Sequence, residues 1–74
     1  MKTVEAVREI MKAQDVGVNK MANRLNKSSR LISERLSQEN ISISKLTEML
    51  RVLDYKIVLL PTETHTPKGG YEVE

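Results

Sequence analysis

Apolar residues recur at spacings of three and four residues along the first two thirds of the chain, and this period is typical of amphipathic helices. The first stripe consists of Val4, Val7 and Met11 and predicts a helix over residues 3–14, which Thr3 can cap. The second stripe consists of Val18, Met21, Ala22 and Leu25. Two helices are therefore expected, separated by a break at Asp15-Val16-Gly17.

Two more helices are predicted after Asn26, which enters the left-handed region at low cost and can turn the chain sharply. A serine of the Lys27-Ser28-Ser29 segment can cap a third helix, which runs to about Gln38 and has a wide polar face. Its few apolar residues are Leu31, Ile32 and Leu36. Ser42 caps a fourth helix that stops near Asp54. The apolar stripe of this helix is Ile43, Leu46, Leu50 and Leu53, with Met49 and Val52 alongside.

The period changes at Tyr55, where an apolar and β-branched run closed by Pro61 predicts one strand over residues 55–60. The backbone of a strand needs a pairing partner, and the sequence pattern offers no second strand. We therefore expect this strand to pair antiparallel with its copy across a two-fold axis. The predicted dimerisation residues are Tyr55, Ile57, Val58, Leu59 and Leu60. The alternative is a short irregular end packed on the helices.

The length of 74 residues allows one domain, which we place at residues 1–61, followed by a flexible tail at 62–74 that carries Pro67, Gly69 and Gly70. The sequence has no cysteine, no signal peptide and no membrane span, so the expected location is the cytoplasm. The sole histidine, His65, lies in the tail, and there is no Gly-rich phosphate loop. We expect no catalytic site, no cofactor and no metal site.

Charge is distributed unevenly along the chain. Residues 18–38 contain five basic residues and one acidic residue, whereas the segment from Pro61 onward contains three acidic residues and one basic residue. A basic middle and an acidic tail favour a polyanionic partner. A solvated helix face explains the charge pattern equally well.

The segment from Val16 to Leu36 is the most informative part of the sequence, because it joins a short helix, a tight turn and a much more polar helix. Such a pair can brace one helix and present the other outward. The DNA major groove admits an α-helix, whose N-terminal side chains then reach base edges. The outward side chains with hydrogen-bonding groups are Ser29, Arg30, Ser33 and Glu34.

The segment from Val16 to Ser33 resembles the helix-turn-helix of the phage repressor and Cro family (XRE-like). Met21-Ala22 matches the apolar-plus-Ala pair of that family, and Leu25 and Ile32 match buried positions of its two helices. The likeness covers about residues 3–54. It implies an all-α, lambda-repressor-like bundle of four helices, here with one C-terminal strand that pairs across a homodimer.

Carried over by position, the resemblance implies that Ser29, Arg30 and Glu34 face bases, with Ser33 beside them. The residues expected near phosphates are Lys20, Lys27, Ser28, Asn40 and Ser42. Val18 stands where the family often has Gln, Asn26 replaces the usual turn Gly, and the loop at residues 37–40 is less basic than usual. The terminal strand replaces the last short helix, as in some antitoxin-type and mobile-element members that dimerise through such strands.

Each of these residues also has a simpler interpretation. Arg30 can be an exposed solubilising residue, and Glu34 can pair with it at the i,i+4 spacing. Lys20 and Arg24 can be surface charges, and Arg35 can cover apolar surface with its stem. The methionines are expected to fill the core.

The sequence thus favours a homodimer that binds specific duplex DNA and represses or autoregulates transcription. The alternative is an antitoxin or phage-encoded inhibitor that binds a protein partner through residues 62–74 or its helical surface, and both functions can coexist. RNA binding is less favoured, because Tyr55 and Tyr71 are too few for a stacking platform.

Overall fold

The computed structural model describes residues 2–62 and 70–73. Four helices are followed by a two-stranded antiparallel sheet. The elements are α1 (Thr3–Ala13), α2 (Val18–Leu25), α3 (Ser29–Leu36), α4 (Ile43–Val52), β1 (Ile57–Leu59) and β2 (Tyr71–Val73). The predicted fold class is confirmed for the four helices and corrected for the strand, which has a partner in its own chain.

The core lies between the apolar stripes that the periodicity predicted. Four large side chains are almost completely shielded from solvent, one from α2, one from α3, one from α4 and one just after α4. They are Met21, Ile32, Met49 and Leu53. Val4, Val7 and Met11 of α1 close the same cluster. Ile43 was expected on the buried stripe, but at the first residue of α4 its exposed fraction is 58%.

Three of the helix breaks use residues in the left-handed region. Asp15, Asn26 and Asp54 have φ angles of 56°, 55° and 61°. The chain then folds back on the helix that it leaves, as when the amide of Val16 donates to the carbonyl of Met11 at 2.8 Å. The predicted breaks at residues 15–17, at Asn26 and near Asp54 are therefore confirmed.

The helix starts follow the predictions for α3 and α4 and differ for α1. Ser28 Oγ accepts from the amide of Leu31 at 3.1 Å, and Ser42 Oγ accepts from the amide of Lys45 at 3.3 Å. Both serines therefore cap helices as expected. Thr3, in contrast, is already the first helical residue of α1, so it does not cap that helix.

The two strands form a hairpin whose register pairs Ile57 with Val73, Val58 with Glu72 and Leu59 with Tyr71. The expectation that the chain has no second strand is wrong, because residues 71–73, predicted as part of a flexible tail, supply it. The first strand is also shorter than the predicted span of 55–60. The tail residues His65, Pro67 and Gly69 lie outside the described residues.

One face of this hairpin is apolar along its whole length. Strand side chains alternate between faces, so Ile57, Leu59, Tyr71 and Val73 share one side. Ile57 packs against the core, whereas Leu59 and Tyr71 farther along are 59% and 73% exposed. A two-stranded hairpin is only marginally stable alone in water. The outer part of this apolar face, at Leu59 and Tyr71, is therefore left unpacked in the described residues.

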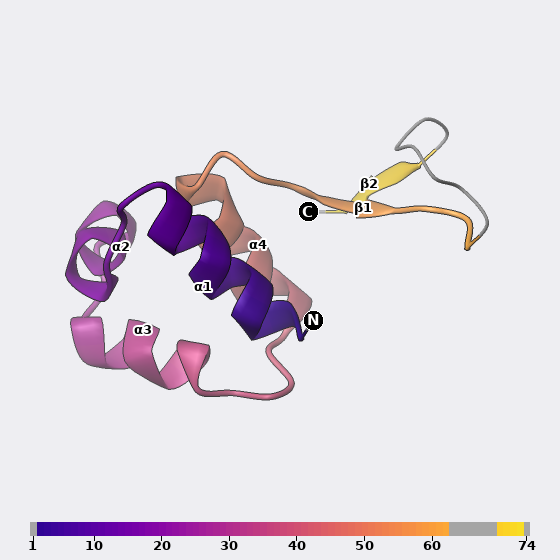
Figure 1. Cartoon of the computed structure of the whole chain (residues 1–74). Helices are drawn as coiled ribbons and strands as arrows, with labels where there is room; N and C mark the ends of the chain where they lie inside the picture. Colours follow the sequence, from indigo (N-terminus) through magenta and orange to yellow (C-terminus); the bar gives the residue numbers. More distant parts are fainter. Residues whose placement is uncertain (1, 63–69, 74) are drawn as a thin grey trace.

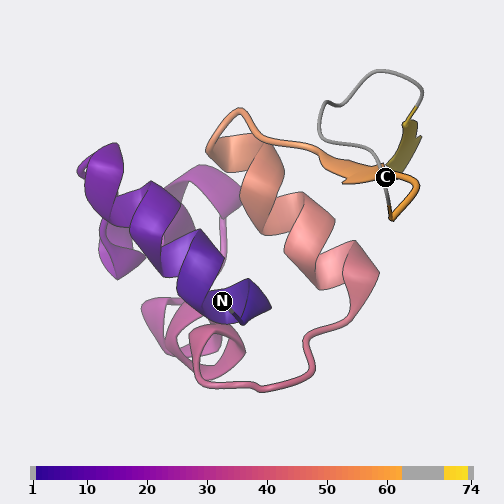
Figure 2. The same cartoon turned by 45° about the vertical axis from the view of Figure 1, so that its right-hand side comes forward.

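Figures 1 and 2 show the hairpin extending away from the helices, with α3 on the opposite side of the molecule. The long axis measures 38 Å and the other two measure 22 and 20 Å. Within residues 2–62 and 70–73, no helix has the length and apolar character needed to cross a bilayer.

Candidate nucleic-acid interface

The candidate interface is built from α2, α3 and the turn between them. The turn is tight because Asn26 takes a left-handed conformation, with φ 55° and ψ 45°. The amide of Lys27 donates back to the carbonyl of Ala22 at 2.9 Å, and Ser28 then caps α3. This local hydrogen bonding fixes the direction in which α3 leaves α2.

Buried side chains hold α3 from behind. Ile32 has no exposed surface and Leu36 has 4%, and both belong to the cluster that contains Met21 and Ala22 of α2. Arg8 of α1 adds a polar contact, because its Nη2 donates to the carbonyl of Leu36 at 3.0 Å at the C-terminal end of α3. The orientation of α3 is thus set by both apolar packing and a hydrogen bond to its last turn.

The opposite side of α3 is open to solvent. The Arg30 side chain is 90% exposed and the Glu34 side chain 59%, and Ser33 between them is exposed as well. Arg30 Nε lies 3.3 Å from Glu34 Oε1, so the predicted i,i+4 pair forms. Three of the four residues predicted to face bases therefore share one exposed surface, and the fourth, Ser29, is half-buried at the start of the helix.

The residues predicted to lie near phosphates surround this surface unevenly. Lys20 and Asn40 are exposed, on α2 and on the loop after α3. Ser28 and Ser42 are also exposed, but each hydroxyl accepts a hydrogen bond from its own helix. Lys27 is drawn toward α4, with its Nζ 4.0 Å from Glu48 Oε2.

Arg35 does more than cover apolar surface with its stem, which was the simpler interpretation of its position. Its side chain is only 8% exposed, and Nη1 donates to Glu48 Oε1 of α4 at 2.5 Å. Among the described residues, its Nε has no hydrogen-bond partner. A sequence signal for this burial existed, because Ile32, Arg35 and Leu36 are spaced as one helical stripe. Arg35 therefore joins α3 to α4 and is not available to a ligand of the exposed side.

Glu48 pairs with two basic residues, Arg35 of α3 and Lys27 of the turn before it. The hydrogen bond from Arg35 lowers the pKa of Glu48 below its ordinary value of 4.5, and the charges of Lys27 and Arg35 act in the same direction, against partial burial. Glu48 thus stays ionised at neutral pH and neutralises the buried guanidinium. No local sequence pattern singles out Glu48, since its partner lies 13 residues away in the chain.

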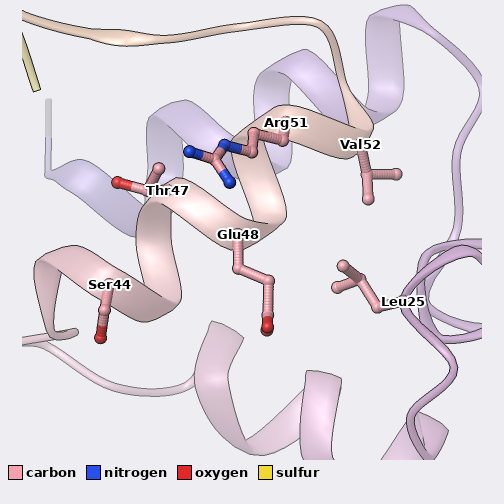
Figure 3. Close-up of a pocket in the computed structure, with 6 residues that line it drawn as sticks. All are labelled: Leu25, Ser44, Thr47, Glu48, Arg51 and Val52. Carbon is pink, nitrogen blue, oxygen red and sulfur yellow. The ribbon is translucent and has the colours of Figure 1, made fainter. Parts of the chain in front are cut away.

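An open groove beside Glu48 gives solvent access to this ion pair. Its volume is about 610 Å³, and it is lined by Leu25, Ser44, Thr47, Glu48, Arg51 and Val52. Figure 3 shows the Glu48 side chain extending away from α4 across from Leu25. The Glu48 side chain is 39% exposed and the Arg35 side chain 8%, so the pair is shielded on the arginine side and open to solvent on the glutamate side.

Asn19 is a further polar residue that the sequence analysis did not select. It lies in the first turn of α2, and its Oδ1 accepts from Ser29 Oγ at 2.5 Å, which links the starts of the two helices. Asn19 itself is exposed. Asn19 therefore contacts Ser29, one of the four residues of α3 that were predicted to read bases.

Comparison of the chain with models of known protein families, with curated proteins and with solved structures found no match. The resemblance to phage repressors therefore stays a prediction from the residues themselves.

Proposed function

We propose that the protein binds duplex DNA through α3 and represses or autoregulates transcription as a homodimer. The observation that carries the proposal is the two-sided character of α3. Ile32 has no exposed surface, whereas Arg30 on the other side is 90% exposed in its side chain. A braced helix with an open polar side is what insertion into a major groove requires.

The chemistry of the open side supports DNA over an arbitrary polar partner. An exposed arginine suits guanine, whose O6 and N7 both accept, and an exposed carboxylate suits the cytosine N4 amine. Arg30 and Glu34 supply these two groups within one helical turn. Lys20 and Lys27 add positive charge on the preceding helix and turn, where a phosphate backbone would pass.

A homodimer is the second part of the proposal, and the hairpin supports it. Leu59 and Tyr71, on the apolar face of the hairpin, are both exposed, although apolar residues of this size are stabilised by burial. A second hairpin in contact with them, through the residues 55–60 predicted for dimerisation, would cover this surface. The hairpin and α3 lie on opposite sides of the molecule (Figures 1 and 2), so such a dimer would leave both copies of α3 accessible. A cytoplasmic location, expected from the sequence, is part of this proposal.

The same exposed hairpin favours the second candidate function, in which the protein is an antitoxin or inhibitor. Here the apolar face of β1 and β2 would contact a different protein, and DNA binding could persist alongside. A stoichiometric partner that is captured by the full chain and lost in a Tyr71→Glu variant would support this candidate. A stable dimer in sedimentation, with the hairpin faces buried against each other, would leave no surface for such a partner and would contradict this candidate.

The experiment for the main proposal is selection of binding sites from random duplexes, followed by affinity measurement on the selected sequence. We expect two half-sites about one helical turn apart. We also expect an affinity that falls steeply between about 50 and about 200 mM salt, as for proteins that displace counterions from phosphates. If no sequence is enriched and no duplex binds at low salt, DNA binding is wrong.

A further inference from the structure

The hydrogen bond between Ser29 and Asn19 has a defined polarity. Ser29 Oγ and Asn19 Oδ1 are 2.5 Å apart. This distance belongs to O–H···O hydrogen bonds and is shorter than those from an amide N–H, which begin at about 2.7 Å. The Ser29 hydroxyl therefore donates its proton, and the carbonyl oxygen of Asn19 accepts it.

This polarity determines what the two side chains offer to a ligand. A hydroxyl has a single proton, so Ser29 Oγ retains only lone pairs and acts as an acceptor. The amide nitrogen of Asn19 carries two protons, and within residues 2–62 and 70–73 no acceptor is in hydrogen-bond contact with it. Asn19 is exposed. The pair thus presents one donor group and one acceptor group side by side at the start of α3.

We propose that Asn19 and Ser29 act as one unit that reads adenine in the major groove, with Asn19 as a specificity-determining residue. Adenine presents an acceptor, N7, next to a donor, the N6 amine, whereas guanine presents two acceptors, cytosine a donor and thymine an acceptor. A donor next to an acceptor therefore complements adenine alone. The position agrees, because side chains near the N-terminus of the inserted helix reach the bases. This inference rests on the proposed function.

The test compares base preferences of the full-length protein and its Asn19→Asp variant, using random duplexes and then duplexes that differ at single positions. Asp keeps an oxygen for the Ser29 hydroxyl but replaces the amide donor by a second acceptor. The wild type should prefer adenine at one position of each half-site by about five- to 150-fold over other bases. In Asn19→Asp and in Ser29→Ala this ratio should fall to near one, and Asn19→Asp should shift toward cytosine.

The readout is a ratio of affinities, so the added negative charge of Asp, which weakens binding to every duplex, does not affect it. Asn23→Ala is the matched control, because Asn23 is an exposed asparagine one turn later on the same helix. It should keep the adenine preference. The adenine unit is overturned if the wild type binds DNA but Asn19→Asp keeps the adenine preference. It is also overturned if Asn19→Asp loses affinity for all sequences alike, with the ratio of affinities for adenine and the other bases unchanged. Neither outcome overturns the DNA-binding function. A wild type that binds no duplex overturns both.

Discussion

Arg35 and Glu48 tie α3 to α4 through a hydrogen bond of 2.5 Å, and Arg35 is the one buried charged residue of the described chain. The helix proposed to read DNA therefore turns one arginine outward and another inward. Arg30 pairs with Glu34 on the open surface and stays 90% exposed, whereas Arg35 is buried against the Glu48 carboxylate. Two arginines five positions apart in one helix thus have opposite roles.

Removal of the Glu48 carboxylate should destabilise the fold. Glu48→Ala leaves the buried Arg35 guanidinium without its acceptor, and an unsatisfied buried group of this kind costs about 1–3 kcal/mol. Urea unfolding followed by circular dichroism measures the loss. The control is Glu39→Ala, which removes an exposed pair with Lys2 at 2.8 Å and should change stability by less than about 1 kcal/mol. Equal effects of the two substitutions would contradict the structural importance of the Arg35 contact.

The same carboxylate predicts a pH dependence of stability. The hydrogen bond from Arg35 lowers the pKa of Glu48 in the folded protein below 4.5, so the ionised form stabilises the fold. This contribution is fully present above the unfolded pKa and is lost as the pH falls through the lower folded pKa. The melting temperature of the wild type should therefore drop as the pH falls below about 4.5, and Glu48→Gln should show a smaller drop. Glu39→Gln should behave as the wild type, and a Glu48→Gln profile parallel to that of the wild type would refute the linkage.

Arg30 and Lys27 should affect DNA binding in different ways. Arg30→Ala removes a proposed base contact, so it should weaken binding to the selected site by about 1–3 kcal/mol and relax selectivity at one position. Lys27→Ala removes a proposed phosphate contact, so it should weaken all sequences alike and reduce the salt slope by about one. Fluorescence anisotropy at several salt concentrations separates the two effects. The face assigned to DNA would be wrong if neither variant changed binding.

Gly70 should be required for the hairpin. A Cβ atom there would lie 2.5 Å from Leu60 Cδ2, 2.5 Å from Val58 Cγ1 and 3.0 Å from the Leu59 carbonyl oxygen. Gly70→Ala should therefore separate β2 from β1, raise amide hydrogen exchange at residues 57–59 and weaken the proposed dimer in sedimentation. Gly17→Ala is the matched control, because no atom outside its neighbours lies within 4 Å of an added Cβ. Unchanged exchange in Gly70→Ala would show that the strands tolerate the side chain.

The four helices could be predicted from sequence because each has an apolar stripe and a local end signal. Asn26, Ser28 and Ser42 act on neighbouring backbone groups, so their roles are legible within a few residues of chain. The partner of β1 could not be found this way. Tyr71-Glu72-Val73 is too short to show a period, and its pairing depends on a contact with residues 57–59.

The candidate interface was predictable in part for the same reason. The exposure of Arg30, Ser33 and Glu34 follows from helical spacing, whereas the Arg35–Glu48 and Ser29–Asn19 contacts join different helices. An arginine on an apolar stripe signals burial, but only the tertiary structure identifies its carboxylate. The roles of Arg35 and Ser29 thus depend on contacts with other helices, which no local sequence pattern encodes.

Met21 and Met49 are wholly enclosed in the core, with no surface in contact with solvent. A thioether in that position reacts with peroxide only when the molecule opens, and the resulting sulfoxide is polar and cannot repack in an apolar interior. Oxidation would therefore hold a transiently opened molecule in a non-native state until the sulfoxide is reduced. The lifetime of the protein under oxidative stress would then follow its folding stability, and the damage would spare molecules whose helices stay closed.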